Sequence, residues 1–356
     1  MTFHWFSGII LIVQRNNKRK EVEKMSKPTY YVILDTETAT LPFVNEWELS
    51  SDDKKKIAIA KPLVYDIGWT IATRSKGTIL KRNYLISETF SVPAIFNTAY
   101  YHEKRPLYLG MLERGEIEIK PWNEVMEILI ADLAKCAYVC AYNAMFDFKK
   151  AIIFTETYIN NLYSRHYYEW EEEQKVFCKH ILKNPSRKES HNFDKDNFVF
   201  RGVNYPMIDI WGLACTHILN CAAYKKACLE NERISNAGIY FSTSAESAMQ
   251  FFSKKFDFIE DHTALSDAEI ETELLFASLK RGKIIQGIVY FPYKMLGETV
   301  EYVMKGRGVT CEMALNVYKK MREYLPEDGV PRTAYQTQIY NKLVALEYFI
   351  QDTWGV

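Results

Sequence analysis

The first clear pattern in the chain is a short apolar run that ends in two acidic residues. Residues 31–34, YVIL, are rich in β-branched and aromatic side chains, a composition typical of a buried strand. Asp35 and Glu37 follow with one residue between them. Side chains two apart along a strand point to the same side, so the pattern predicts both carboxylates at one spot. The alternative at this point is a solvated turn that carries two acids.

Downstream patterns alternate between strands and helices. Residues 63–86 contain two strand-like runs around the turn at 75–77, which predicts a β-hairpin. Residues 50–60 predict a capped helix or a surface excursion, and residues 121–136 have apolar side chains at helical spacing. Residues 138–141 predict another apolar strand. This order predicts an α/β fold with a mixed central sheet, in which the hairpin supplies the antiparallel strands.

A third acid, Asp147, follows the strand at 138–141 and begins a predicted helix. If this strand lies beside the first one, Asp147 joins the two earlier carboxylates at one edge of the sheet. A role as a helix N-cap is the alternative. The apolar side chains expected to face inward from this helix are Phe148, Ile152 and Ile153.

A fourth acid and a histidine flank the start of the predicted helix in residues 261–281. Ser266 and Glu269 have the spacing of a capping box, which predicts that the helix begins near Ser266. His262 and Asp267 lie on either side of this start. A lone histidine in such a place is usually structural, but the neighbouring acid and the three upstream carboxylates favour a catalytic role.

Like charges at the end of a buried strand repel each other and are costly to desolvate. A divalent cation offsets that cost, since Mg²⁺ or Mn²⁺ takes hard oxygen ligands and keeps positions for water and phosphate. The four carboxylates therefore suggest a metal site.

The composition is that of an ordinary soluble protein: 356 residues, 48% hydrophobic and 25% charged. Basic and acidic residues number 45 each, so affinity for nucleic acid would need a local basic patch. The seven cysteines are irregularly spaced, which favours free thiols in a reducing compartment, and we expect a cytoplasmic protein.

The first 27 residues are expected to form an N-terminal extension. The apolar run at 3–13 is too short to span a bilayer, which needs about 20 residues, and its basic residues follow it rather than precede it. We therefore expect no membrane association. Our hypothesis is that folding starts near Met25 and that residues 1–24 are a dispensable or non-native extension.

Three motifs follow one another along the chain: DTET at 35–38, AYNAMFD at 141–147 and HTALSD at 262–267. Taken in order, they resemble the DEDDh superfamily of 3′-5′ exonucleases, which includes the epsilon subunit of bacterial DNA polymerase III, ribonuclease T and oligoribonuclease. The resemblance covers about residues 28–282 and implies a ribonuclease-H-like fold, with an internal strand that ends at Asp209.

The resemblance also implies residue roles. Two Mg²⁺ or Mn²⁺ ions would be held by four carboxylates, and His262 would act as general base. The implied metal ligands are Asp35, Glu37, Asp147 and Asp267. The implied substrate-binding residues are Thr38, Leu41, Asn143 and Phe146, with Leu41 or Phe146 stacking or wedging against the last bases.

The rest of the chain surrounds this core. The long separation between the second and third motifs predicts an insertion at about 155–205. Its basic stretch at 179–193 would contact nucleic acid, or else form a solvated loop or a protein contact. The aromatic and basic residues at 96–115 are expected to pack as a helix on the sheet or to contact single strands. Residues 283–356 predict an α-rich C-terminal extension, extended at 283–304 and helical at 311–324 and 335–350, which packs on the core or docks a polymerase or replication factor.

The expected function is a metal-dependent 3′-5′ exonuclease that acts on single-stranded 3′ ends, with DNA favoured, and releases nucleoside 5′-monophosphates. An exoribonuclease for short RNA or RNA 3′ ends is the alternative enzyme. A catalytically silent module that binds nucleic acid or a replication factor is the alternative from another class.

Overall fold

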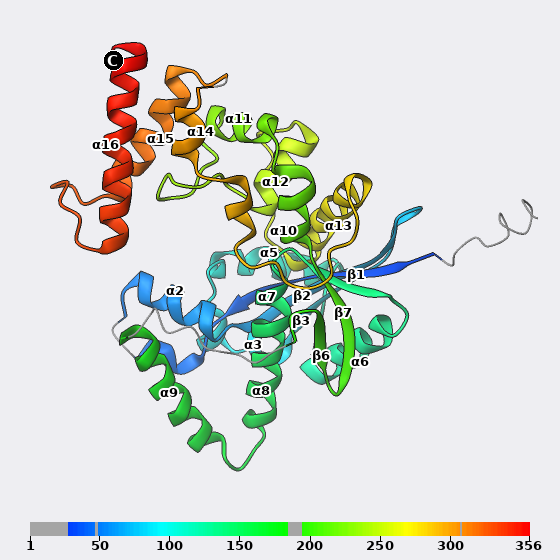
Figure 1. The fold of residues 1–356 in the computed structure, drawn as a ribbon. Coiled ribbons are helices and arrows are strands. Elements are labelled where there is room, and N and C mark those ends of the chain that lie inside the picture. Colours follow the sequence, from blue (N-terminus) through cyan, green and yellow to red (C-terminus); the bar gives the residue numbers. More distant parts are fainter. Residues whose placement is uncertain (1–27, 47–48, 184–193, 307) are drawn as a thin grey trace, which may run out of the picture.

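The computed structural model describes residues 28–46, 49–183, 194–306 and 308–356. Its centre is a seven-stranded mixed sheet with the strand order β4-β3-β2-β1-β5-β7-β6 (Figure 1). The predictions for residues 1–27 and for most of the basic stretch at 179–193 lie outside the described residues. The strands are β1 (Tyr30–Ala39), β2 (Leu63–Thr73), β3 (Gly77–Ile86), β4 (Glu118–Lys120), β5 (Tyr138–Ala141), β6 (Asn197–Phe200) and β7 (Val203–Asp209).

The predicted α/β class and mixed sheet are confirmed. Strands β1, β2 and β3 are successively antiparallel, and the turn between β2 and β3 forms the predicted hairpin. On the other side of β1, strands β5 and β7 run parallel to it. The short outer strands complete the sheet, with β4 parallel to β3 and β6 antiparallel to β7.

Each face of the sheet has its own hydrophobic core, and β1 contributes alternate residues to each. Val32 and Leu34 pack with helices α6 (Trp122–Leu133) and α8 (Ile152–Leu162). Tyr31 and Ile33 pack on the other face. The helices over that face include α10 (Ile210–Ala214) and α13 (Ala264–Arg281). Because side chains alternate along a strand, Asp35 and Glu37 continue the row of Tyr31 and Ile33 toward α13.

The remaining helices connect the strands or form the C-terminal part. They are α2 (Ser51–Ala60), α3 (Ser87–Phe90), α4 (Pro93–Phe96), α5 (Arg105–Glu113), α7 (Ala144–Phe146), α9 (Tyr167–Lys183), α11 (Ala222–Glu230), α12 (Ala245–Ser253), α14 (Thr299–Met304), α15 (Cys311–Tyr324) and α16 (Ala334–Trp354). Short turns of 3₁₀ helix are η1 (Pro42–Glu46), η2 (His102–Lys104) and η5 (Pro292–Leu296). Single turns of π helix are η3 (Asp147–Ala151) and η4 (Cys215–Leu219).

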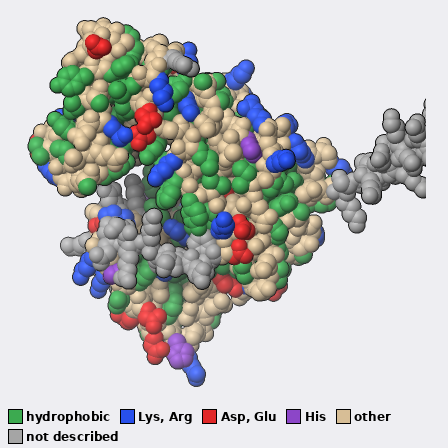
Figure 2. All heavy atoms as spheres, in the orientation of Figure 1, with side chains coloured by type: hydrophobic (Ala, Val, Ile, Leu, Met, Phe, Trp, Pro, Cys, Tyr) green, Lys and Arg blue, Asp and Glu red, His purple; other side chains and the backbone are tan. Residues whose placement is uncertain are grey.

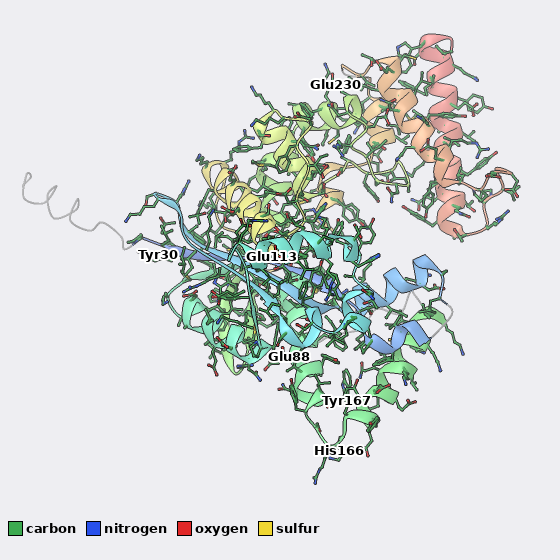
Figure 3. The ribbon with its side chains drawn as sticks, turned by 180° about the vertical axis from the view of Figure 1, so that it is seen from behind. Tyr30, Glu88, Glu113, His166, Tyr167 and Glu230 are labelled. Atoms are coloured by element: carbon green, nitrogen blue, oxygen red, sulfur yellow. The ribbon has the colours of Figure 1, made fainter. Side chains whose placement is uncertain are left out.

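The C-terminal helices α14, α15 and α16 share the second core with α11 and α13. In Figure 3, Glu230 at the end of α11 lies beside these helices, whereas His166 lies at the opposite end of the molecule. Helices were predicted in both places where α15 and α16 form. The expectation that residues 283–304 are extended is wrong for its second half, because residues 292–296 form η5 and residues 299–304 form α14.

Two local predictions meet different outcomes. The helix expected in residues 50–60 is confirmed as α2, and the side chain of Ser50 accepts a hydrogen bond from the amide of Asp53. The prediction that Ile153 faces inward is wrong: it is 36% exposed, whereas Phe148 and Ile152 are buried. The π-helical turn η3 precedes α8 and rotates the following residues relative to a regular α-helix, so Ile153 does not lie on the buried face that the spacing predicted.

None of the helices in the described part of the chain is long and apolar enough to cross a membrane. Acidic and basic side chains are interspersed on the face shown in Figure 2, in keeping with their equal numbers. All seven cysteines are free thiols, as the sequence predicted.

Candidate active site

The start of α13 is tied to the end of β1 through a buried carboxylate. Asp66 of β2 pairs with Glu37 of β1 in the antiparallel register. Asp66 Oδ2 accepts hydrogen bonds from the backbone amide of Ala264 at 3.0 Å and from the hydroxyl of Tyr108 at 2.9 Å. The first amide of α13 is therefore satisfied by a side chain from the sheet, which places this helix end next to Glu37.

The predicted capping box does not form. Helix α13 begins at Ala264, so Ser266 lies inside its first turn, and Thr263 at the N-cap makes no side-chain hydrogen bond with the helix. The helix still starts close to the predicted position, and Asp66 takes over part of the capping role.

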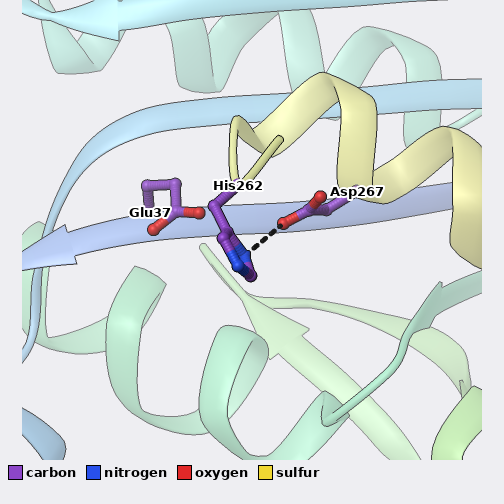
Figure 4. A group of neighbouring side chains, drawn as sticks. All are labelled: Glu37, His262 and Asp267. Carbon is purple, nitrogen blue, oxygen red and sulfur yellow. Dashed lines mark ion pairs between the residues drawn. The ribbon is translucent and has the colours of Figure 1, made fainter. Parts of the chain in front are cut away.

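Three of the predicted catalytic side chains meet at this junction (Figure 4). Glu37 from β1, Asp267 from α13 and His262 from the preceding loop each offer a ligand atom, and these atoms lie within 4.8 Å of one another. The Nδ1 atom of His262 is 3.7 Å from Asp267 Oδ2. Residues more than 200 positions apart in the sequence thus form one cluster of polar side chains.

Asp35 and Asp147 lie beside this cluster, although they are not members of the 4.8 Å group. Burial raises the pKa of Asp35 well above its usual value, and the carboxylates of Asp147, Glu271 and Asp267 raise that pKa further. Burial likewise raises the pKa of Asp147 to about 7, against the opposing effect of a 2.7 Å hydrogen bond from the Thr36 hydroxyl. The structure therefore brings all four predicted carboxylates to one region.

The electrostatics of this region fit a divalent cation. Burial raises the pKa of Glu37 well above its usual value, as do Asp267 and Asp66, and Lys104 opposes this only in part. Asp267 Oδ1 is buried and has no hydrogen-bond partner among the described residues. Carboxylates that raise one another's pKa in this way need either protons or a bound cation, and oxygen ligands suit Mg²⁺ or Mn²⁺.

His262 is held at the surface rather than in the core, with 28% of its side chain exposed. Its backbone has a φ of 47°, a conformation that residues other than glycine seldom adopt. The ring of Tyr101 stacks on the imidazole, with centroids 4.6 Å apart and planes inclined by 14°. The Asp267 carboxylate, 3.7 Å from Nδ1, is the main cause that raises the pKa of His262, which makes the imidazole a stronger base.

The predicted substrate-binding residues have different exposures. Thr38 and Phe146 are half-buried and Asn143 is exposed, so each has some accessible surface. Leu41 is fully buried in the first core, together with Phe43 and Val44. The prediction that Leu41 wedges against a base is therefore wrong for this structure, because its side chain is covered by the core.

Several residues that the sequence analysis did not single out belong to the site. Glu271 lies one helical turn after Asp267 and accepts a hydrogen bond from the amide of Tyr142 at 3.1 Å. Its spacing of four residues from Asp267 was the signal that could have identified it. Thr36 and Asp66 carry no such local signal, since they contact Asp147 and Ala264, which are distant in the sequence. Glu260 lies two residues before His262, but it belongs to no motif that marks it.

Comparison of the chain with protein-family models, with curated proteins and with solved structures finds no match. The interpretation of the site therefore depends on its own residues and their geometry.

Proposed function

We propose that this protein is a metal-dependent 3′-5′ exonuclease of the DEDDh type with a ribonuclease-H-like fold. It would remove nucleoside 5′-monophosphates from the 3′ ends of single-stranded nucleic acid, with DNA favoured. The observation that carries the proposal is the meeting of Glu37, His262 and Asp267 at the junction of β1 and α13. The sheet supports it too. Strands β3, β2 and β1 are successively antiparallel, and β5 and β7 run parallel to β1, so the carboxyl ends of β1, β5 and β7 lie at the same edge.

Two Mg²⁺ or Mn²⁺ ions would be held by Asp35, Glu37, Asp147 and Asp267. Bound there, they would supply Lewis acids at the scissile phosphate and neutralise the charge that develops on the departing 3′ oxygen. The hydrogen bond from the Thr36 hydroxyl to Asp147 Oδ1 fixes the orientation of this carboxylate.

His262 would take the proton from the attacking water. Its Nδ1 atom faces carboxylates, so Nε2 is the nitrogen left to accept that proton. A positioned general base typically contributes a factor of about 10² to 10⁴ to the rate. The general base would thus come from the loop before α13, and the cation ligands from the sheet edge and from the helices at its side.

The segment that carries Tyr101 and Lys104 would meet the nucleic-acid strand. Tyr100 is 68% exposed and packs edge-on against Tyr101, whose ring reaches His262. The ammonium group of Lys104 lies 4.4 Å from the centre of the Tyr101 ring. Aromatic side chains beside basic ones favour single strands, because bases stack on the rings while the cations bind phosphates.

The test is digestion of end-labelled single-stranded DNA and RNA of the same sequence with Mg²⁺, with EDTA, and with the variants Asp35→Asn and His262→Ala. We expect stepwise shortening from the 3′ end with the wild type, and loss of cleavage with EDTA or Asp35→Asn. Glu269→Gln is the matched control, because Glu269 lies on α13 but pairs with Lys81 of β3. Preferential cleavage of RNA would favour the exoribonuclease, and binding without cleavage would favour a silent module.

The C-terminal helices would offer a surface for a polymerase or replication factor, as the sequence predicted. Because their inner faces are part of the second core, such a partner would have to use the outer faces of α15 and α16. Co-purification of a polymerase with the full chain, lost on changing outer residues of α16, would test this docking.

A further inference from the structure

Glu260 lies beside His262 and is absent from the three sequence motifs. Its Oε2 atom is 3.7 Å from His262 Nδ1, the same distance that separates this nitrogen from Asp267 Oδ2. The Glu260 side chain is only 10% exposed, and its Oε1 atom is buried without a hydrogen-bond partner among the described residues. One ring nitrogen therefore faces two carboxylates.

The two carboxylates have different tasks under the proposed function. Asp267 would share its oxygens with a cation, which weakens its hold on the imidazole. Glu260 is not a member of the Glu37–His262–Asp267 group and remains available as the acceptor for an Nδ1–H group. A carboxylate in this position sets the tautomer and the orientation of a histidine ring.

Other contacts hold the same loop. The Tyr101 ring covers one face of the imidazole, and Lys104 donates a hydrogen bond to the backbone carbonyl of Asp261. The backbone at His262 has the left-handed φ of 47°, a strained conformation that the contacts of this loop help to hold.

We propose that Glu260 is a positioning residue that holds Nδ1 of His262, with Tyr101 fixing the ring plane, so that Nε2 faces the attacking water. This inference rests on the proposed exonuclease function and adds a residue to it. Glu260 touches neither substrate nor cation and acts through the imidazole.

A cation between Glu246, Glu260 and His262 is the competing interpretation, because their ligand atoms also lie within 4.8 Å of one another. However, Glu246 Oε1 is 3.2 Å from the guanidinium of Arg233 and accepts a hydrogen bond from Gln250 at 3.1 Å. A guanidinium this close repels a second cation, which favours the positioning role.

The first test is a double-mutant cycle with full-length protein, Mg²⁺ and a labelled oligonucleotide. Glu260→Ala should lower kcat by about 10-fold or more with little change in KM, the order seen when an orienting carboxylate is removed. Glu260→Gln, which keeps an acceptor oxygen, should recover part of that loss. In a His262→Ala background, Glu260→Ala should cause no further loss, because both residues act through one ring.

An equal loss in both backgrounds would mean that Glu260 serves the fold or the cations, and would overturn the proposal. Wild-type kcat in both Glu260 variants would overturn it as well. Glu269→Gln is the control for removing one negative charge from this part of the protein.

The second test does not depend on turnover. In protein labelled with ¹⁵N-histidine and loaded with Mg²⁺, the His262 signals, identified by their loss in His262→Gln, should report a proton on Nδ1 in the neutral ring. In Glu260→Ala the population should shift toward the Nε2–H tautomer, and an unchanged spectrum would overturn the inference.

The two tests separate the proposals. A wild type that leaves DNA and RNA uncleaved refutes the proposed function, while the spectra still decide whether Glu260 holds the ring. A wild type that cleaves and loses activity in His262→Ala, but not in the Glu260 variants, refutes only the role of Glu260.

Discussion

Gly68 of β2 and Leu265 of α13 are in direct backbone contact: a Cβ atom on Gly68 would lie 2.3 Å from the nitrogen of Leu265. Gly68 also pairs with Asp35 in the register of β1 and β2. The absence of a side chain at this position therefore lets the first turn of α13 rest on the sheet beside the acidic end of β1. This contact places Asp267 next to Glu37.

Replacing Gly68 with alanine should separate α13 from the sheet. The added methyl group would meet backbone atoms of Ala264 and Leu265, which cannot move aside as a flexible side chain does. We expect Gly68→Ala to lower the free energy of unfolding by about 1–3 kcal/mol or more and to reduce Mg²⁺-dependent cleavage sharply. Urea unfolding and the cleavage assay measure the two effects.

Gly110→Ala is the matched control for this substitution. Its Cβ would meet only the end of the Arg114 side chain, at 3.1 Å, and alanine favours the helix α5 in which it lies. This variant should be as stable as the wild type or slightly more stable. Wild-type stability and activity of Gly68→Ala would show that the close contact is not required.

Asp35→Asn should separate cation binding from folding. In the metal-free protein, the substitution removes a half-buried carboxylate whose pKa is raised by desolvation and by its acidic neighbours, so the free energy of unfolding should stay the same or increase. In wild-type protein, Mg²⁺ at 100 times its dissociation constant should add about 2.7 kcal/mol of stability. Thermal unfolding with EDTA and with Mg²⁺ should show this gain in the wild type, and a much smaller gain in Asp35→Asn would support the site.

The metal-free protein should lose stability as the pH rises from about 4 to 7. Burial raises the pKa of Asp66 from 3.8 to about 7, so over this range the folded state binds more protons than the unfolded state. The stability that comes from the protonated carboxyl is complete below pH 4 and lost above pH 7. For Asp66 alone, the loss is about 4 kcal/mol at most. Urea unfolding in EDTA across this pH range measures it.

Asp66→Asn should reduce this pH dependence, since the amide oxygen can still accept from Ala264 and Tyr108. Asp132→Asn is the control. Hydrogen bonds from Lys135 and Trp69 hold the pKa of Asp132 below its usual value despite burial, so its titration falls below this window. A slope between pH 5 and 7 that is the same in wild type and Asp66→Asn would contradict the prediction.

Lys104→Gln should weaken binding of single strands and flatten its salt dependence. If Lys104 contacts one phosphate, the slope of log affinity against log salt should fall by about 0.7. Fluorescence anisotropy with a labelled oligonucleotide measures this slope, in Ca²⁺ to prevent turnover. Lys76→Gln, in the exposed hairpin turn at the other end of β2, removes the same charge and should leave the slope unchanged.

Local sequence patterns were sufficient to predict much of the sheet and its chemistry. The period-two alternation of β1 decided which face Asp35 and Glu37 share, and the hairpin followed from a turn between two apolar runs. The helical spacing in residues 311–324 matched α15 residue for residue. These features depend on interactions between near neighbours, which is why periodicity and turn residues encode them.

The tertiary structure alone decided the surroundings of the site. Asp66 satisfies the first amide of α13, Tyr101 stacks on His262, and Glu260 faces the same ring nitrogen as Asp267. The tertiary structure also buries Leu41, which the resemblance had implied as a substrate-binding residue. The contacts made by Asp66 and Tyr101 join residues more than 100 positions apart, and even the loop that holds Glu260 takes its shape from distant segments. Long-range packing, unlike local spacing, leaves no periodic trace in the sequence.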